Sequence, residues 1–246
     1  MYPKLYVLSS GVQTIKKQKL LSSADKNEDI DIPVPYFLVD LGNEKVLIDT
    51  GISFDSKSNI AQAKGKTQNP TEALSKLGID KNSIGYIIQT HLHFDHAANT
   101  KLFPNAKVIV QLEELKAAYF YDPNFEHGYV DEDIKNPSTQ WEPIIGMKSL
   151  FDNRILILPT PGHTSGHQSV VVKLENYGPA IIAGDVAPLR ENIDNNTAPG
   201  VASSPKDAYY SILSLKEFAN FLNAKIWYGH DPKFFEEIKL APEYYD

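Results

Sequence analysis

One short segment concentrates side chains that bind metal ions. Residues 91–96 read HLHFDH, which places His91, His93, Asp95 and His96 within six positions. The segment follows the apolar run at 86–89, and residues two apart in an extended chain point the same way, so the first two histidines can reach one ion. If the chain then turns into a helix, Asp95 and His96 face a neighbouring point. Imidazole and carboxylate groups are good ligands for zinc and similar ions, whereas packing gives no reason for this ligand density.

Three more ligand-type residues follow expected strands, in loops that contain glycine. They are His163 in TPGHT, Asp185 after IIAG, and His230 in YGHD. Loops at strand ends are where a scaffold often places catalytic groups. Each residue alone would be interpreted as an ordinary polar residue, but beside the HLHFDH segment each becomes an expected partner. The predicted metal ligands are therefore His91, His93, Asp95, His96, His163, Asp185 and His230.

The two other histidines receive different interpretations. His127 lies in a polar stretch beside Gly128, and we expect no functional role for it. His167 leads into an expected strand, which favours a structural or supporting role.

Short apolar runs separated by polar stretches indicate many strands. We expect strands at 4–9, 36–41, 45–48, 86–89, 107–111, 154–158, 169–174, 180–183 and 225–228. Helices are expected at 70–77, 112–120 and 205–222, with a short one near Pro232. Residues 13–31 and 186–205 read as loops, and 53–69 are polar. Residues 121–146 read as an irregular insertion.

The chain shows no repeat, low-complexity tract or linker, so we predict a single domain over residues 1–246 with a lid at about 119–146. This lid is rich in aromatic residues, namely Tyr119, Phe120, Tyr121, Phe125, Tyr129 and Trp141. Such a lid could cover an apolar acyl chain, and it could equally form a contact between two copies of the chain. A monomer and a homodimer both remain open.

Composition limits the function classes. A hydrophobic content of 42% and a charged content of 22% are ordinary for a soluble globular protein. The net charge of −7 argues against a nucleic-acid surface. The absence of cysteine excludes disulfides, thiolate nucleophiles and sulfur ligands from cysteine. The N-terminus lacks the pattern of a secretory signal and no stretch approaches a membrane span, so we expect a cytoplasmic protein with no membrane partner.

The order of these residues resembles the metallo-β-lactamase superfamily. Its pattern is an early Asp, HxHxDH, a His, an Asp and a late His, and here Asp49 in LIDTG precedes the HLHFDH segment and the three later ligands. The resemblance implies an α/β (α+β) fold, an αββα sandwich in which two mixed sheets pack together with helices outside. Within the superfamily, the sequences HLHFDHA, PGHTSGHQS, GHD and PEY resemble the N-acyl-homoserine-lactone lactonases, the quorum-quenching branch.

The resemblance also implies a division of roles among the residues. Two divalent metal ions would be bound, with zinc the default and iron, manganese or cobalt suited to the same donors. A hydroxide bridging the ions would attack the lactone carbonyl, and Asp95 would protonate the departing ring oxygen. Asp49 would orient a ligand histidine, or else serve as a turn carboxylate. The implied ligands are His91, His93 and His163 for one ion, Asp95, His96 and His230 for the other, and Asp185 as the bridge.

One position departs from the lactonase pattern. Those lactonases usually carry, three residues after the bridging aspartate, a tyrosine whose hydroxyl contacts the lactone carbonyl in the substrate pocket. This chain has Pro188 at that pocket position, and proline offers no donor. Tyr209 or Tyr210 could replace that hydroxyl. Phe94, between two expected ligands, could line the substrate pocket or be a core aromatic.

Three functions stay open on this basis. The leading prediction is a lactonase acting on N-acyl-homoserine lactones. A glyoxalase II-like thioester hydrolase, or another carboxylic ester hydrolase, would keep every metal ligand and differ in the pocket. A non-catalytic metal-binding protein is the alternative from another class.

Overall fold

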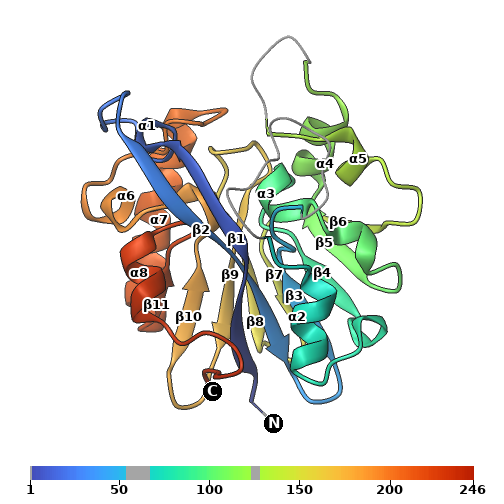
Figure 1. Cartoon of the computed structure of the whole chain (residues 1–246). Helices are drawn as coiled ribbons and strands as arrows, with labels where there is room; N and C mark the ends of the chain where they lie inside the picture. Colours follow the sequence, from blue (N-terminus) through green and yellow to red (C-terminus); the bar gives the residue numbers. More distant parts are fainter. Residues whose placement is uncertain (1, 54–66, 123–127) are drawn as a thin grey trace.

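Two β-sheets lie at the centre of the computed structural model, which describes residues 2–53, 67–122 and 128–246 (Figure 1). Both sheets combine parallel and antiparallel pairs. In the described residues, the first sheet has the order β1-β2-β3-β4-β5-β6, with β1 Lys4–Lys16, β2 Asp29–Asp40, β3 Lys45–Ile48, β4 Tyr86–Ile88, β5 Lys107–Gln111 and β6 Gln140–Ile144. The second has the order β11-β10-β9-β8-β7, with β7 Lys148–Leu150, β8 Ile155–Pro159, β9 Gln168–Lys173, β10 Pro179–Ile182 and β11 Lys225–Trp227.

Alternation along the strands creates the layers. On β3, Val46 and Ile48 enter the core between the sheets, where Ile157 of the second sheet also packs. Leu47 points the other way and packs with Leu74 of α2 (Pro70–Lys76). The outer face of the second sheet packs in the same way against α7 (Pro205–Leu222). Because side chains alternate across a strand, each sheet has two apolar faces, and an αββα sandwich results.

The remaining helices are short. They are α1 Lys17–Leu20, α3 Phe94–Ala97, α4 Leu112–Tyr119, α5 Asp131–Ile134, α6 Arg190–Asp194 and α8 Pro232–Glu237. The two packing helices begin at capped positions, since Asn69 accepts from Thr71 N and Ser204 accepts from Asp207 N. None of the helices in the described ranges is long and apolar enough to cross a membrane.

The structure confirms several predicted elements and corrects others. The strands at 45–48 and 107–111 and the helix at 205–222 have the predicted bounds. The predicted loop at 13–31 is wrong, because β1 continues to Lys16 and β2 begins at Asp29 as a long hairpin. Because exposed polar residues lie along one face of that hairpin, its sequence reads as polar and the alternation of apolar and polar side chains is hard to recognise. The loop at 186–205 contains α6, and β7 was not predicted. Most of the polar stretch 53–69 lies outside the described residues.

The predicted insertion at 121–146 is irregular only in part. Its end, Gln140–Ile144, forms β6, which pairs in parallel with β5 as part of the first sheet. Trp141 of β6 packs against the apolar clusters beside that sheet. Phe125 and His127 lie outside the described residues.

Strands of both sheets end close to one another. The parallel strands β3 and β4 are followed by Asp49 and the HLHFDH segment, and the parallel strands β10 and β11 are followed by Asp185 and His230. Parallel neighbours deliver the residues after them to the same sheet edge, which places these groups together.

Candidate metal centre

The seven predicted ligands come together in two neighbouring groups. Every one of the seven side chains is buried. Within each group the possible ligand atoms all lie within 4.8 Å of one another. The first group is His91, His93 and His163, and the second is Asp95, His96, Asp185 and His230.

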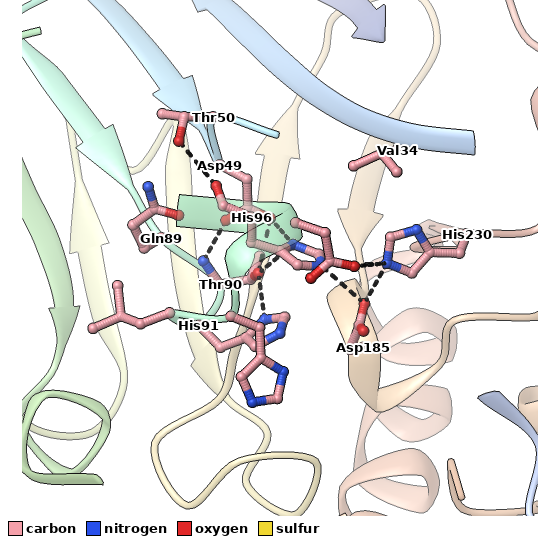
Figure 2. Close-up of polar contacts among 12 residues, drawn as sticks. Val34, Asp49, Thr50, Gln89, Thr90, His91, His96, Asp185 and His230 are labelled. Atoms are coloured by element: carbon pink, nitrogen blue, oxygen red, sulfur yellow. Dashed lines mark hydrogen bonds and ion pairs between the residues drawn. The ribbon is translucent and has the colours of Figure 1, made fainter. Parts of the chain in front are cut away.

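Asp185 contacts both groups, and Figure 2 shows its contacts with His96 and His230 of the second. Its Oδ1 is 3.3 Å from His96 Nε2 and 3.1 Å from His230 Nε2. Its Oδ2 faces the first group, 3.6 Å from His163 Nε2. The Asp185 backbone N–H donates to His167 Nε2 at 2.9 Å. His167 therefore supports the carboxylate that joins the groups, in agreement with its predicted supporting role.

Three histidines use Nδ1 to contact an oxygen outside the centre. A carbonyl or carboxylate oxygen can only accept, so Nδ1 carries the hydrogen and a neutral ring keeps its lone pair on Nε2. Two of these lone pairs face each other, because the Nε2 atoms of His96 and His230 are 3.2 Å apart. The Nδ1 partners are Asp49 Oδ2 for His96 at 2.8 Å, Pro33 O for His230 at 2.8 Å and Val201 O for His163 at 2.7 Å.

The charges of the centre also favour cations. Burial lowers the pKa of His91 and of His93 well below the usual range, and neighbouring imidazoles lower it further. Burial alone would lower the pKa of His96 too, but Asp185, Asp49 and Asp95 reverse this and raise it. Nε2 of His91 is buried without a hydrogen-bond partner. His91 and His93 thus stay neutral and offer lone pairs, whereas the carboxylates that raise the pKa of His96 and His230 stabilise positive charge beside them. Such a set of donors fits a pair of divalent metal ions.

Asp49 is buried and orients its neighbours instead of closing a turn. Its Oδ1 accepts from Thr90 N at 2.7 Å, and its Oδ2 accepts from Thr90 Oγ1 at 2.8 Å and contacts His96 Nδ1 (Figure 2). Its φ of 58° is in the left-handed region, which is uncommon outside glycine. This agrees with the predicted role of orienting a ligand histidine.

Glu114 of α4 is a supporting residue that the sequence did not reveal. It is fully buried, and burial raises its pKa. Its Oε1 accepts from Leu92 N at 2.9 Å and from the Tyr129 hydroxyl at 3.2 Å. Its Oε2 accepts from Thr164 Oγ1 at 2.5 Å and from Gly166 N at 3.2 Å. Glu114 thus joins the HLHFDH segment to the loop that carries His163.

A cavity of about 1040 Å³ opens onto the two groups. His93, Asp95, His163 and Asp185 lie in its wall. The predicted pocket residues Phe94 and Pro188 line it, together with Phe120, Tyr121 and Tyr129 from the predicted lid. On another side it is lined by β1, through Gln13, Thr14, Ile15 and Lys16.

Four aromatic residues that the sequence suggested for the substrate site do not line the described cavity. Tyr209 and Tyr210 are 42% and 56% exposed on α7, and neither belongs to the described cavity wall, so they do not replace the missing tyrosine there. Tyr119 and Trp141 are likewise absent from the described wall.

Comparisons with known proteins agree with this geometry. The family model of the metallo-beta-lactamase superfamily matches residues 30–230. The N-acyl homoserine lactonase AttM of Rhizobium radiobacter is 30% identical over 258 residues, which cover 98% of each chain. The N-acyl homoserine lactonase AiiA of Bacillus thuringiensis subsp. kurstaki is 27% identical over 253 residues, again with 98% of each chain covered.

Two solved structures extend the likeness. A quorum-quenching N-acyl homoserine lactone lactonase superposes with a TM-score of 0.89 at 29% identity, covering 99% of each chain. An N-acyl homoserine lactone hydrolase with the product N-hexanoyl-L-homoserine bound at its catalytic metal center gives a TM-score of 0.88 at 27% identity, covering 99% of this chain and 100% of that one. This chain therefore belongs to the metallo-beta-lactamase superfamily, and its relatives there include the N-acyl homoserine lactonases.

Proposed function

We propose that this chain is a two-metal hydrolase that opens the lactone ring of N-acyl-homoserine lactones. The observation that carries the proposal is the position of Asp185, whose two oxygens face two separate groups of buried ligands at the wall of one cavity. The names of AttM and AiiA, and the product bound in a structural neighbour, support the choice of substrate class.

Each residue then has a role in holding the ions. His91, His93 and His163 would hold one ion, Asp95, His96 and His230 would hold the other, and Asp185 would contact both. Zinc is the metal we propose, with iron, manganese or cobalt compatible with the same donors. When bound, a pair of such ions polarises a substrate carbonyl and makes hydroxide available at neutral pH.

The chain's own groups would complete the reaction. Asp95 lies in the cavity wall, 3.6 Å from His230 Nε2, where its carboxylate would take the proton of the attacking hydroxide and pass it to the departing ring oxygen. Asp185 holds the two halves of the centre at a fixed spacing. Phe94 forms apolar wall beside Asp95. The carbonyl of Pro188 accepts from His230 N at 2.8 Å, so this residue supports the centre although it lacks a donor.

We further propose a single domain over residues 1–246, with the segments around Phe120 and Tyr129 forming a lid over the cavity. We propose that the protein is cytoplasmic and acts as a monomer or homodimer. We also propose that it binds neither nucleic acid nor membranes. The net charge of −7 supports the part concerning nucleic acid.

The test is ring opening, followed as proton release, with metal content assayed on the same sample. N-acyl-homoserine lactones, simple γ-lactones and thioesters are compared side by side. We expect fast opening of the lactones with about two ions per chain, and loss of most activity and of metal in His93→Ala and Asp185→Asn. Two bound ions with thioester turnover alone would indicate the glyoxalase II-like alternative, and two ions with no turnover a non-catalytic metal-binding protein.

A further inference from the structure

One polar side chain in the cavity wall makes no side-chain hydrogen bond to the described part of the chain. Gln13 on β1 is 8% exposed and lines the cavity. Within the described residues, no side-chain hydrogen bond reaches its carboxamide. A carboxamide offers two N–H donors and an acceptor oxygen, and these are left for water or a ligand in the cavity. Its spare bonding capacity is therefore available to whatever occupies the cavity.

The neighbours of Gln13 are either paired or apolar. The Thr14 hydroxyl donates to the Asp31 carboxylate, and Lys16 pairs with Asp29 at 2.8 Å. Ile15 and Ile32 belong to an apolar cluster beside this wall, and both also line the cavity. The carboxamide of Gln13 is therefore the polar group on this part of β1 that stays available to a ligand in the cavity.

The strand register places Gln13 close to the metal centre. Gln13 pairs with Ile32 of β2, and the preceding pair is Val12 with Pro33. The carbonyl of Pro33 accepts from His230 Nδ1 at 2.8 Å, and Val34 lies beside His230 in Figure 2. Opposed residues in such a ladder are about 5 Å apart at Cα. A small ligand can therefore contact the ion-binding groups and Gln13 at once.

We propose that the Gln13 carboxamide binds the exocyclic amide of the substrate and selects amide-bearing lactones over alkyl lactones. This rests on the proposed lactonase function. A carboxamide presents both N–H and C=O groups, which complement the C=O and N–H groups of the amide that joins the acyl chain to the lactone ring. An alkyl γ-lactone has no such amide and gains nothing from Gln13. The residue thus sets specificity, and the ring-opening step itself belongs to the metal centre.

The experiment compares kcat/KM for N-hexanoyl-homoserine lactone and γ-octalactone, using metal-loaded wild type, Gln13→Leu and Thr14→Val. Gln13→Leu is expected to lower the ratio of kcat/KM for N-hexanoyl-homoserine lactone to kcat/KM for γ-octalactone about 5- to 100-fold. This is the effect expected from losing one or two hydrogen bonds to the substrate amide. Thr14→Val is the matched control on the same wall, because its hydroxyl is already paired, and its ratio should stay within about twofold of wild type. The thermal midpoint of Gln13→Leu should not fall, because the Gln13 side-chain amide makes no hydrogen bond to the described residues that the substitution could remove.

Three outcomes would overturn the proposal. An unchanged ratio in Gln13→Leu would show that the amide is not bound there. A parallel loss on both lactones with a lowered thermal midpoint would show that Gln13 serves the fold. Absence of ring opening by the metal-loaded wild type would refute the proposed function itself, and the wild-type rates identify that case before any variant is compared.

Discussion

Replacing Glu114 with glutamine should weaken the metal centre although Glu114 contacts none of the proposed ligand side chains. Each of its oxygens accepts from one backbone N–H, Leu92 N at Oε1 and Gly166 N at Oε2. Leu92 stands between His91 and His93, and Gly166 belongs to the loop that carries His163. The carboxylate therefore fixes the two segments that supply the first group of histidines.

The geometry sets the size of the effect. Glutamine keeps the shape but turns one oxygen into an NH₂ group, and whichever oxygen is replaced then faces a backbone N–H that cannot accept. Leaving one buried N–H unsatisfied costs about 1–3 kcal/mol, so we expect Glu114→Gln to lower the free energy of unfolding by that amount. Because the histidine segments lose a shared anchor, metal affinity should fall about tenfold, the lower end of the range for groups that orient ligands.

The assay is urea unfolding of metal-loaded protein, with metal affinity measured by competition with a chelator. Glu113→Gln is the matched control, because Glu113 precedes Glu114 on the same helix and has an exposed side chain paired with Lys116 at 2.7 Å. That variant should stay within about 0.5 kcal/mol of wild type. A Glu114→Gln protein as stable as the control, with unchanged metal affinity, would refute the reasoning.

The remaining predictions concern the centre itself. Asp49→Asn should weaken binding of one ion about 10- to 100-fold, because the amide cannot accept from both Thr90 N and His96 Nδ1; chelator competition measures this. Gly128→Ala should displace the His93 ring and reduce kcat, because an added Cβ would lie 2.4 Å from its Cγ; steady-state kinetics at saturating metal check it. Stripping both ions should lower the thermal midpoint by about 16–32 °C, the loss of roughly 4 kcal/mol for each ion at a thousand times its Kd, and added zinc should restore it in calorimetry.

Local patterns made much of this molecule predictable. The four predicted ligands between His91 and His96 are neighbours in sequence, and the change from extended chain to the short α3 helix places two of them in each group. The α7 helix has a capping Ser204, a proline at its start and one apolar face, and its predicted bounds agree with the structure. The order of the later ligands was informative because each follows a strand.

Long-range partners explain what could not be predicted. Glu114 reads as an ordinary helix residue beside Glu113, and only the fold places it against Leu92 and Gly166. The long β1–β2 hairpin was concealed because Thr14 and Lys16 are exposed polar residues whose partners lie across the ladder. In both cases the contact joins residues that are distant in the sequence, and local periodicity cannot predict such a contact.

The centre depends on both sheets at once, which links metal binding to the packing between them. The first sheet delivers His91 and His96 after β4, whereas the second delivers Asp185 and His230 after β10 and β11. The Asp185 oxygens lie 3.1 to 3.6 Å from histidines of both halves. Contacts of this length tolerate only small changes of spacing, so the apolar core between the sheets is part of what positions the proposed ligands. An ion bound there holds the two sheets together in turn, and its binding free energy adds to that of folding.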